Sequence, residues 1–506
     1  MVNRTVLDPG KRRRATILIT VCIALMAVIA SVSGLNVAQP KLATEFNASQ
    51  GMVLWMINIY TLSLAAMLLP LGAIGDRWGR RRMLLSGLLI FGVASIISGL
   101  APSSYIMLAA RLLSGLGAAM IMPVTLAVIT STFPDEERSK AIGIWTGVAG
   151  GGGILGMYLS AILVDLADWR WLFALPVVLV IVAFMMTLRF IPDSVEKTKH
   201  KFDIVGSLLS IIAVIGIVFA LHEAPGAGWG DLVTLVSMII GVTGAVGFVL
   251  WELRQEGPLL DIRLFREHGL SSGSVTLLTV FGVQAGIFVV LFPYFQGVLG
   301  WSGLRSTFAM MPMALLMMLA SGLAPGISIH IGSRFTMATG IMFGSIGAAL
   351  MAAFVSVEGG YLSVLPGMLT MGLGMGLTMT PSTEAITSAL PADRQGVASA
   401  LNDITRELGT ALGVALLGAL VTAGYSNAIG SRLDLLPMGI AAVAREGIAN
   451  ALAIAPRAAS QSGMLIRVAK ESFVQGWQHA MWIGAGVMAV LFIYILVLGP
   501  KTNKKI

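Results

Sequence analysis

A short basic segment, GAIGDRWGRRR (72–82), lies between two long apolar runs of the sequence. Each run is about 18 to 20 residues long, and a helix of that length crosses the roughly 30 Å hydrocarbon core of a bilayer. Because Lys and Arg accumulate in cytoplasmic loops, a loop this short and basic is predicted to stay in the cytoplasm. The segment therefore predicts a membrane-spanning architecture and its orientation together.

Composition supports lipid as the solvent of this chain. Of its 506 residues, 56% are hydrophobic and 11% charged, whereas soluble domains carry about 25% charged residues. The net charge of +8 is explained by basic loops, because no basic amphipathic stripe with interleaved aromatics suggests a nucleic-acid partner. With Cys22 as the single cysteine, neither an internal disulfide nor a cysteine metal site is expected, and no metal site is predicted.

Fourteen apolar runs are predicted to be helices, because a spanning segment in lipid must satisfy its backbone polar groups internally. The first run is too long for a typical signal sequence and is interpreted as a retained helix. An even number of spans with the N-terminus inside places the C-terminus inside too. The predicted spans are 15–38, 51–74, 82–101, 104–131, 138–164, 171–191, 205–222, 232–253, 268–298, 304–327, 334–355, 361–389, 395–424 and 476–498.

The spans are predicted to form two related halves with two extra helices between them. We expect an N-terminal six-helix bundle in 1–191, linkers and the extra pair in 192–267, and a C-terminal six-helix bundle in 268–506. The loop APGISIHIGSRF after the tenth span is a faint echo of the basic loop. Such repeats place a substrate site near the bilayer midplane. The extracytoplasmic loop 425–475 is interpreted as a cap, a partner surface or a surface hairpin without chemistry.

Several motifs in this order resemble the major facilitator superfamily, and within it the fourteen-helix drug:proton antiporters of the EmrB/QacA type. They are GAIGDRWGRRRMLL, ARLLSGLGAAMIMP, the glycine-patterned fifth span, PLLDIRLF and FPYFQGVLGWSGLRSTFAMMPMAL. The resemblance implies a multi-pass protein of the bacterial cytoplasmic (inner) membrane, acting as a monomer and not as an enzyme.

The function implied is secondary active efflux, by alternating access, of lipophilic cationic or neutral compounds in exchange for protons. No cofactor is implied other than the proton as coupling ion. The alternative is an uncoupled or differently coupled exporter or facilitator of a neutral metabolite or antibiotic.

The basic loop is the predicted gate. Asp76 can cap a helix N-terminus or pair with an arginine across helices, and the glycines allow close backbone approach. The resemblance implies a latch that closes the cytoplasmic side. The alternative is that the arginines only set topology and bind anionic headgroups. The predicted gating residues are Gly72, Asp76, Arg77, Gly79 and Arg80.

The thirteenth span carries the charged cluster Asp403, Arg406 and Glu407. Residues three and four apart share a helix face, and a carboxyl group in a dry cavity can load a proton near neutral pH. The resemblance implies that Asp403 and Glu407 couple protons to transport. The alternative is a static Asp403–Arg406 pair beside a silent Glu407. Glu384 in the twelfth span is a weaker candidate.

Arg111 lies inside the fourth span. An arginine in the membrane is costly unless it is paired or solvated, so it is a functional candidate by default. The resemblance assigns it to the proton-coupling network, and the alternative is a structural link to backbone carbonyls.

The fifth span contains Gly143, Gly152 and Gly156, which match the G-x8-G-x3-G part of the antiporter motif. Small residues permit close helix packing. Where the family continues with Pro and Gly-Gly, this chain has other residues, namely Met157, Ser160 and Ala161.

Three positions that carry acids in the resembled family are occupied here by Ser31, Asn58 and Met317. We therefore expect any coupled proton to be carried by the thirteenth span, and monovalent or neutral substrates to be preferred. Aromatic rings attract cations, and methionines adapt to varied shapes. The predicted cavity residues are Asn58, Tyr60, Trp145, Tyr158, Phe292, Tyr294 and Arg406.

Overall fold

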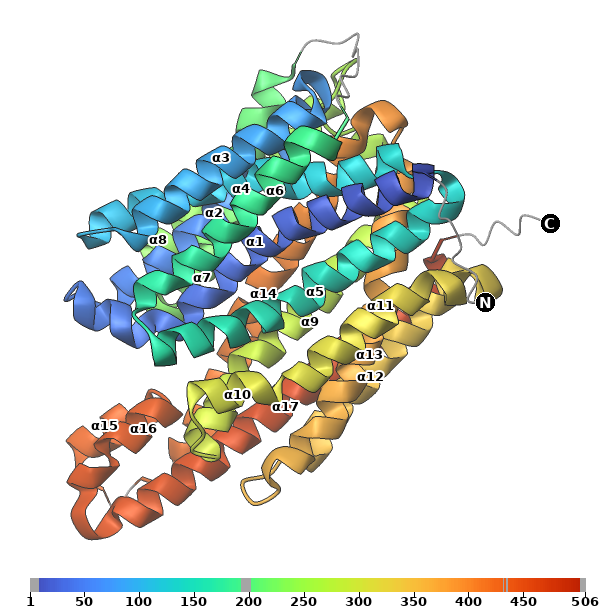
Figure 1. Ribbon diagram of the computed structural model, residues 1–506. Helices are drawn as coiled ribbons and strands as arrows, with labels where there is room; N and C mark the ends of the chain where they lie inside the picture. Colours follow the sequence, from blue (N-terminus) through green and yellow to red (C-terminus); the bar gives the residue numbers. More distant parts are fainter. Residues whose placement is uncertain (1–8, 193–201, 431, 434–435, 501–506) are drawn as a thin grey trace, which may run out of the picture.

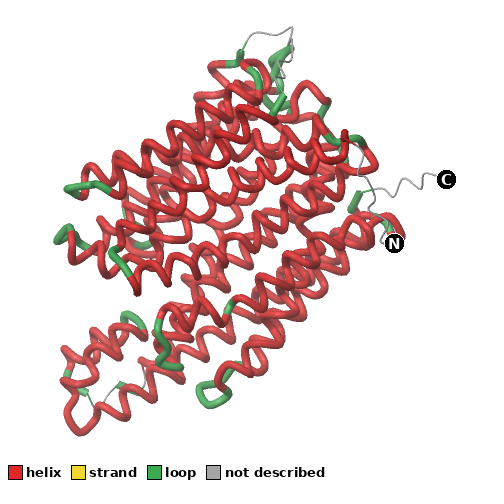
Figure 2. Tube along the Cα trace, in the orientation of Figure 1, coloured by secondary structure: helices red, strands yellow, loops and turns green. Residues whose placement is uncertain are grey.

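The computed structural model describes residues 9–192, 202–430, 432–433 and 436–500. Within these residues the secondary structure is entirely helical, with loops confined to the ends of the helices (Figure 2). In this part of the chain, fourteen helical segments are long and apolar enough to cross a membrane, which confirms the predicted number of spans.

The first six spans are here called the N-half, and two of them, the second and the fourth, begin after serine N-caps. Ser49 and Ser103 accept hydrogen bonds from the backbone N–H groups of Met52 and Ile106, which satisfies free donors of the first turn. The elements of the N-half are α1 (Pro9–Glu45), α2 (Gln50–Trp78), α3 (Arg80–Gly99), α4 (Ser104–Thr132), α5 (Asp135–Leu166), η1 (Trp169–Phe173) and α6 (Ala174–Phe190).

The extra pair consists of α7 (Ile204–Ala227) and α8 (Leu232–Glu252), which begin after the N-cap residues Asp203 and Asp231. The two helices pack on each other, and α7 also contacts α2 and a helix of the second half, α14 (Gln395–Gly430). The pair therefore lies against both halves of the molecule.

The remaining spans form the C-half. Its elements are η2 (Ile262–Arg266), α9 (His268–Pro293), η3 (Tyr294–Val298), α10 (Gly303–Ala309), α11 (Met311–Ile331), α12 (Ser333–Phe354), α13 (Gly360–Ala389), η4 (Ala392–Arg394), α14, α15 (Met438–Arg445), α16 (Ile448–Ile454), η5 (Ala455–Gln461) and α17 (Ser462–Leu498).

Three features of the C-half differ from the predicted spans. The predicted span 304–327 is interrupted at Met310, because Pro312 has no N–H to continue the hydrogen-bond pattern of α10. Helix α14 ends at Gly430 rather than at residue 424, and α17 begins at Ser462 rather than at residue 476. The segment between them is therefore shorter than the predicted loop, and it contains α15 and α16.

The arrangement of the helices defines two ends of the bundle (Figure 1). Helix α1 begins and α17 ends at the same face, here called the terminal face, and α15 and α16 lie at the opposite face, here called the loop face. The two halves meet where α5 packs on α11 and α13, and where α2 and α4 pack on α14. That the terminal face is cytoplasmic stays a prediction from the loop charges.

Candidate functional site

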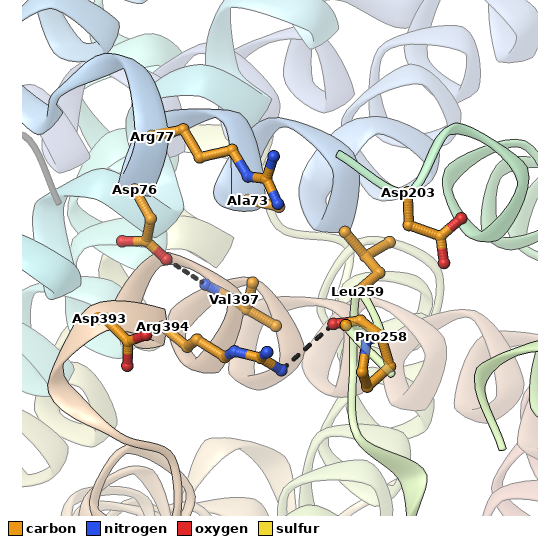
Figure 3. A pocket seen from close by; sticks show the side chains of 10 residues that line it. Ala73, Asp76, Arg77, Asp203, Pro258, Leu259, Asp393, Arg394 and Val397 are labelled. Atoms are coloured by element: carbon orange, nitrogen blue, oxygen red, sulfur yellow. Dashed lines mark hydrogen bonds between the residues drawn. The ribbon is translucent and has the colours of Figure 1, made fainter. Parts of the chain in front are cut away.

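The gate candidate Asp76 reaches from α2 into the opposite half (Figure 3). Its Oδ1 and Oδ2 atoms each lie 2.8 Å from the backbone nitrogen of Gly396, and Oδ2 lies 3.3 Å from that of Val397. Both N–H groups belong to the first turn of α14, whose unpaired donors and dipole favour a negative charge. Asp76 thus caps a helix of the other half.

The same carboxylate also pairs with arginine. The Nη2 atom of Arg80 lies 3.2 Å from Asp76 Oδ1 and donates to the carbonyl oxygen of Ala392 at 3.3 Å. Asp76 and Arg80 are 3% and 1% exposed. A charged pair this deeply buried requires good geometry to offset its desolvation, and the helix N-terminus supplies the additional hydrogen bonds.

Two glycines make this contact sterically possible. A Cβ atom on Gly72 would lie 2.6 Å from the carbonyl oxygen of Gly396, so the backbones of α2 and α14 touch there. Gly79 joins α2 to α3 with φ 106°, a conformation that L-residues rarely adopt. The positions predicted for a latch therefore meet at the terminal face, while their gating role stays a prediction.

The gate also contacts the extra helix pair. A cavity of about 50 Å³ brings Asp76 and Arg77 together with Asp203, which caps α7, and with the linker that follows α8 (Figure 3). Arg394 donates from Nη1 to the carbonyl oxygen of Pro258 in that linker, at 3.2 Å. The guanidinium of Arg77 lies 5.5 Å from the ring centroid of Phe202.

Helix α5 forms the second contact between the halves through its glycines. A Cβ atom on Gly143 would lie 2.8 Å from the carbonyl oxygen of Ser321 in α11, whereas Gly152 and Gly156 face α1 near Met26 and Ala30. The predicted motif therefore serves two interfaces.

Two hydrogen bonds link α5 to α13 across the contact between the two halves, which is here called the seam. The hydroxyls of Thr146 and Thr380 lie 2.7 Å apart, and Ser139 donates to the carboxylate of Glu384. Glu384 is thus engaged in contact between the halves, and any proton-coupling role for it stays a prediction.

The two acids of the charged cluster on α14 differ in their hydrogen bonds and ion pairs. Asp403 is fully buried, and its Oδ1 atom lies 3.6 Å from Nη1 of Arg406 and accepts from Asn402 Nδ2 at 3.2 Å. Glu407 is partly exposed, and in the described part of the chain its carboxylate has no hydrogen-bond or ion-pair partner. One acid of the cluster is therefore paired, and the other is available.

Arg406 lies among aromatic rings from both halves. Its guanidinium carbon is 4.5 Å from the ring centroid of Phe281 in α9 and 5.8 Å from that of Trp145 in α5. The indole of Trp145 is fully buried and donates to Thr125 Oγ1 at 3.0 Å. Two of the predicted cavity residues, Trp145 and Arg406, thus come together across the seam.

Arg111 is completely buried where α1, α2 and α4 meet. It donates from Nη1 to Ser31 Oγ at 2.9 Å and from Nε to the carbonyl oxygen of Met56 at 3.3 Å. Its guanidinium carbon lies 4.3 Å from the ring centroid of Tyr60. The backbone contact matches the structural alternative, and a coupling role stays a prediction.

The other predicted cavity residues are spread over the molecule. Tyr158 lines an apolar cavity of about 660 Å³ and lies 5.8 Å from the ring of Phe308, between centroids. Tyr294 is buried in the C-half, where its hydroxyl donates to the carbonyl oxygen of Ser356, and Phe292 packs against the same core. These two side chains contribute to packing of the C-half core in this conformation. Asn58 lies partly buried on α2.

Some contacting residues were not predicted from the sequence. Gly396 and Val397, whose N–H groups donate to Asp76, lie just after a short loop. The local sequence signal for them is Pro391, which marks the start of a new helix but does not show what caps it. Phe281 and the Thr146–Thr380 contact carry no sequence signal, because each depends on the packing of distant helices.

Comparisons with known proteins agree with this arrangement. Residues 21–414 match the family model of the Major Facilitator Superfamily. The multidrug resistance protein Stp of Mycobacterium tuberculosis is 30% identical over 492 residues, covering 95% of this chain and 91% of the relative. The tetracenomycin C resistance and export protein of Streptomyces glaucescens is 30% identical over 495 residues, covering 96% and 91%.

Solved structures show the same fold. A bacterial homologue of the human lysosomal transporter Spinster superposes with a TM-score of 0.60 at 17% identity, covering 97% of each chain. Fourteen spans, a sequence match along most of the chain and this structural likeness lead to one assignment: the chain belongs to the major facilitator superfamily.

Proposed function

We propose that this protein is a proton-driven exporter of lipophilic small molecules that works by alternating access in the bacterial cytoplasmic membrane, as a monomer. Its superfamily consists of transporters, so the chain is a membrane transporter and not an enzyme. Relatives along nearly its whole length are named for multidrug resistance and for antibiotic resistance and export, which supports drug export as the transport direction.

The conformation supports alternating access. At the terminal face, Asp76 caps α14 and Arg80 donates to Ala392, so the halves are joined there by buried charged groups. The seam continues inward through Thr146 and Thr380. A transporter whose closed face depends on a few such contacts can open that face when they break.

The observation that carries proton coupling is the contrast between Glu407 and Asp403. Asp403 has Arg406 as its counter-charge and is fully buried, which suits a static role. Glu407 lies about 18 Å along α14 from the start of that helix at the terminal face; among the described residues it has no hydrogen bond or ion pair and interacts with Arg406 only electrostatically, over a longer distance. An unpaired carboxyl group at the seam between the halves is suited to bind either a proton or the donor group of a substrate.

The experiment measures efflux in proteoliposomes with an imposed pH gradient. Glu407→Gln is expected to reduce gradient-driven efflux at least tenfold, while Glu407→Asp, which keeps a titratable group, retains part of it. Exposed Glu446, on the loop face, supplies the control Glu446→Gln, which is expected to transport normally. Unchanged gradient-driven efflux in Glu407→Gln would remove this residue from coupling.

A second candidate function, an exporter or facilitator without proton coupling, is favoured by Ser31, Asn58 and Met317. These residues leave three positions without the acids of the resembled family. Collapsing the pH gradient separates the two functions, because an antiporter stops accumulating substrate against its gradient and a facilitator equilibrates as before.

A further inference from the structure

The buried charge of Arg111 is only partly satisfied by the protein. Of its three guanidinium nitrogens, Nε donates to Met56 and Nη1 to Ser31, whereas Nη2 is buried and has no hydrogen-bond partner among the described residues. Guanidinium groups carry five N–H donors and no acceptor, and a buried donor without an acceptor is destabilising. The site therefore has unused donor capacity.

Arg111 also has no counter-charge of its own. In the described residues no carboxylate lies within 4 Å of it, and its side-chain oxygen partner is the neutral hydroxyl of Ser31. The ring of Tyr60 lies against the guanidinium and supplies a cation–π contact only. A fully buried arginine without a carboxylate partner is suited to bind an oxygen acceptor of a ligand.

The position of Arg111 connects it with Glu407. Arg111 of α4 lies over the ring of Tyr60 of α2, and both of these N-half helices pack on α14, the C-half helix that carries Glu407. Arg111 lies about 10 Å along α4 from the loop-face end of that helix. Arg111 and Glu407 therefore lie on helices of opposite halves that pack directly on each other.

We propose that Arg111 is a specificity-determining residue that binds a carbonyl or carboxylate oxygen of the transported compound. This proposal rests on the proposed export function and deepens it, because it names the substrate class. The preferred compounds are lipophiles that carry such an oxygen, with either no net charge or a single cationic group for Glu407. Purely cationic compounds without an acceptor are bound less well, since Arg111 repels them and keeps its free donor.

The test is equilibrium binding of two matched probes to the purified protein without a pH gradient. The probes are benzyltriphenylphosphonium and (4-carboxybenzyl)triphenylphosphonium, which differ by one carboxylate. A charge-assisted hydrogen bond is expected to favour the carboxylate probe by about tenfold or more in Kd. Wild type without that preference, including failure to bind either probe, would overturn the proposal.

Two sets of variants separate binding from a structural role. Arg111→Gln is expected to weaken the carboxylate probe about tenfold and the benzyl probe by much less. Ser31→Asp provides an internal carboxylate for Arg111 and is expected to abolish the preference, whereas Ser31→Asn, of similar size but uncharged, is expected to lose much less of it.

A purely structural Arg111 predicts different results: equal weakening of both probes in Arg111→Gln, or an unchanged preference in Ser31→Asp, and either outcome contradicts the proposal. Failure of proton coupling is distinguishable, because it appears as unaltered efflux in Glu407→Gln while the binding preference and its dependence on Arg111 persist.

Discussion

The loop between α2 and α3 and the loop between α11 and α12 occupy corresponding places in the two halves. Each consists of one glycine that ends a helix and precedes the next, with φ 106° and ψ 130° at Gly79 and φ 88° and ψ 151° at Gly332. Within the described ranges, only the first loop contacts the opposite half through a charged side chain. The residue three positions before the glycine is Asp76 in one loop and Ile329, 82% exposed, in the other.

The basic residues of the two loops differ in the same way. Arg80 belongs to the contact between the halves, whereas Arg334 donates to the carbonyl oxygens of Gly499 and Pro500 at the end of α17, in its own half. The comparison shows that a shared turn geometry is not enough for a gate. A carboxylate facing a helix N-terminus of the other half supplies the closing interaction.

The largest expected effect is that of Asp76→Asn. It removes the charge from the bonds to Gly396 and Val397, which is expected to destabilise the closed terminal face by about 2 kcal/mol, because charge-assisted hydrogen bonds contribute about 1.5–3 kcal/mol. Spin labels at Trp78 and on α12 at Phe335, both exposed positions, in a Cys22→Ser background, measure opening as a broader distance distribution.

Asp393 lines the same small cavity as Asp76 and is exposed. Asp393→Asn is therefore the matched control and is expected to leave that distribution unchanged. Identical distributions in Asp76→Asn and wild type would show that the cap does not hold this face closed.

A smaller effect separates Gly79→Ala from Gly332→Ala. Both changes place an L-residue at positive φ, where strain is of the order of 1–3 kcal/mol. Both variants are expected to lower the Tm of the purified protein to a similar extent, but only Gly79→Ala is expected to reduce efflux beyond its loss of folded protein. Equal losses of specific efflux would mean that the two turns are functionally equivalent.

The smallest effect is expected for Ile329→Asp, which introduces the carboxylate of the first loop into the second. The side chain at this position is exposed and, in the described residues, faces no helix N-terminus of the other half. The free energy of unfolding is expected to change by no more than about 0.5 kcal/mol, with normal efflux. A gain in closed-state population by the same distance measurement would contradict the comparison.

Three residues show what could and what could not be predicted from the sequence. That Asp76 caps a helix could be expected from its residue type, but not that the helix is α14, which begins more than 300 residues later. The spacing of the cluster on α14 already allowed the Asp403–Arg406 pair within that helix, whereas the rings of Phe281 and Trp145 beside Arg406 come from other helices and could not be predicted. Tyr294 is a cavity candidate by residue type; in this conformation it is buried in the core of the C-half, and a role in a substrate cavity stays a prediction.

The sequence is enough to assign this protein to a lipid bilayer, to give the number of its spans and to locate the charges within them, because the length and polarity of a helix are local properties of the chain. Contacts between charged groups and distant helices depend on the tertiary structure. The surroundings of a buried carboxylate or guanidinium are set by other helices. The packing of the two halves places Asp76 at the N-terminus of α14, leaves Glu407 without an ion pair and leaves Nη2 of Arg111 without an acceptor among the described residues.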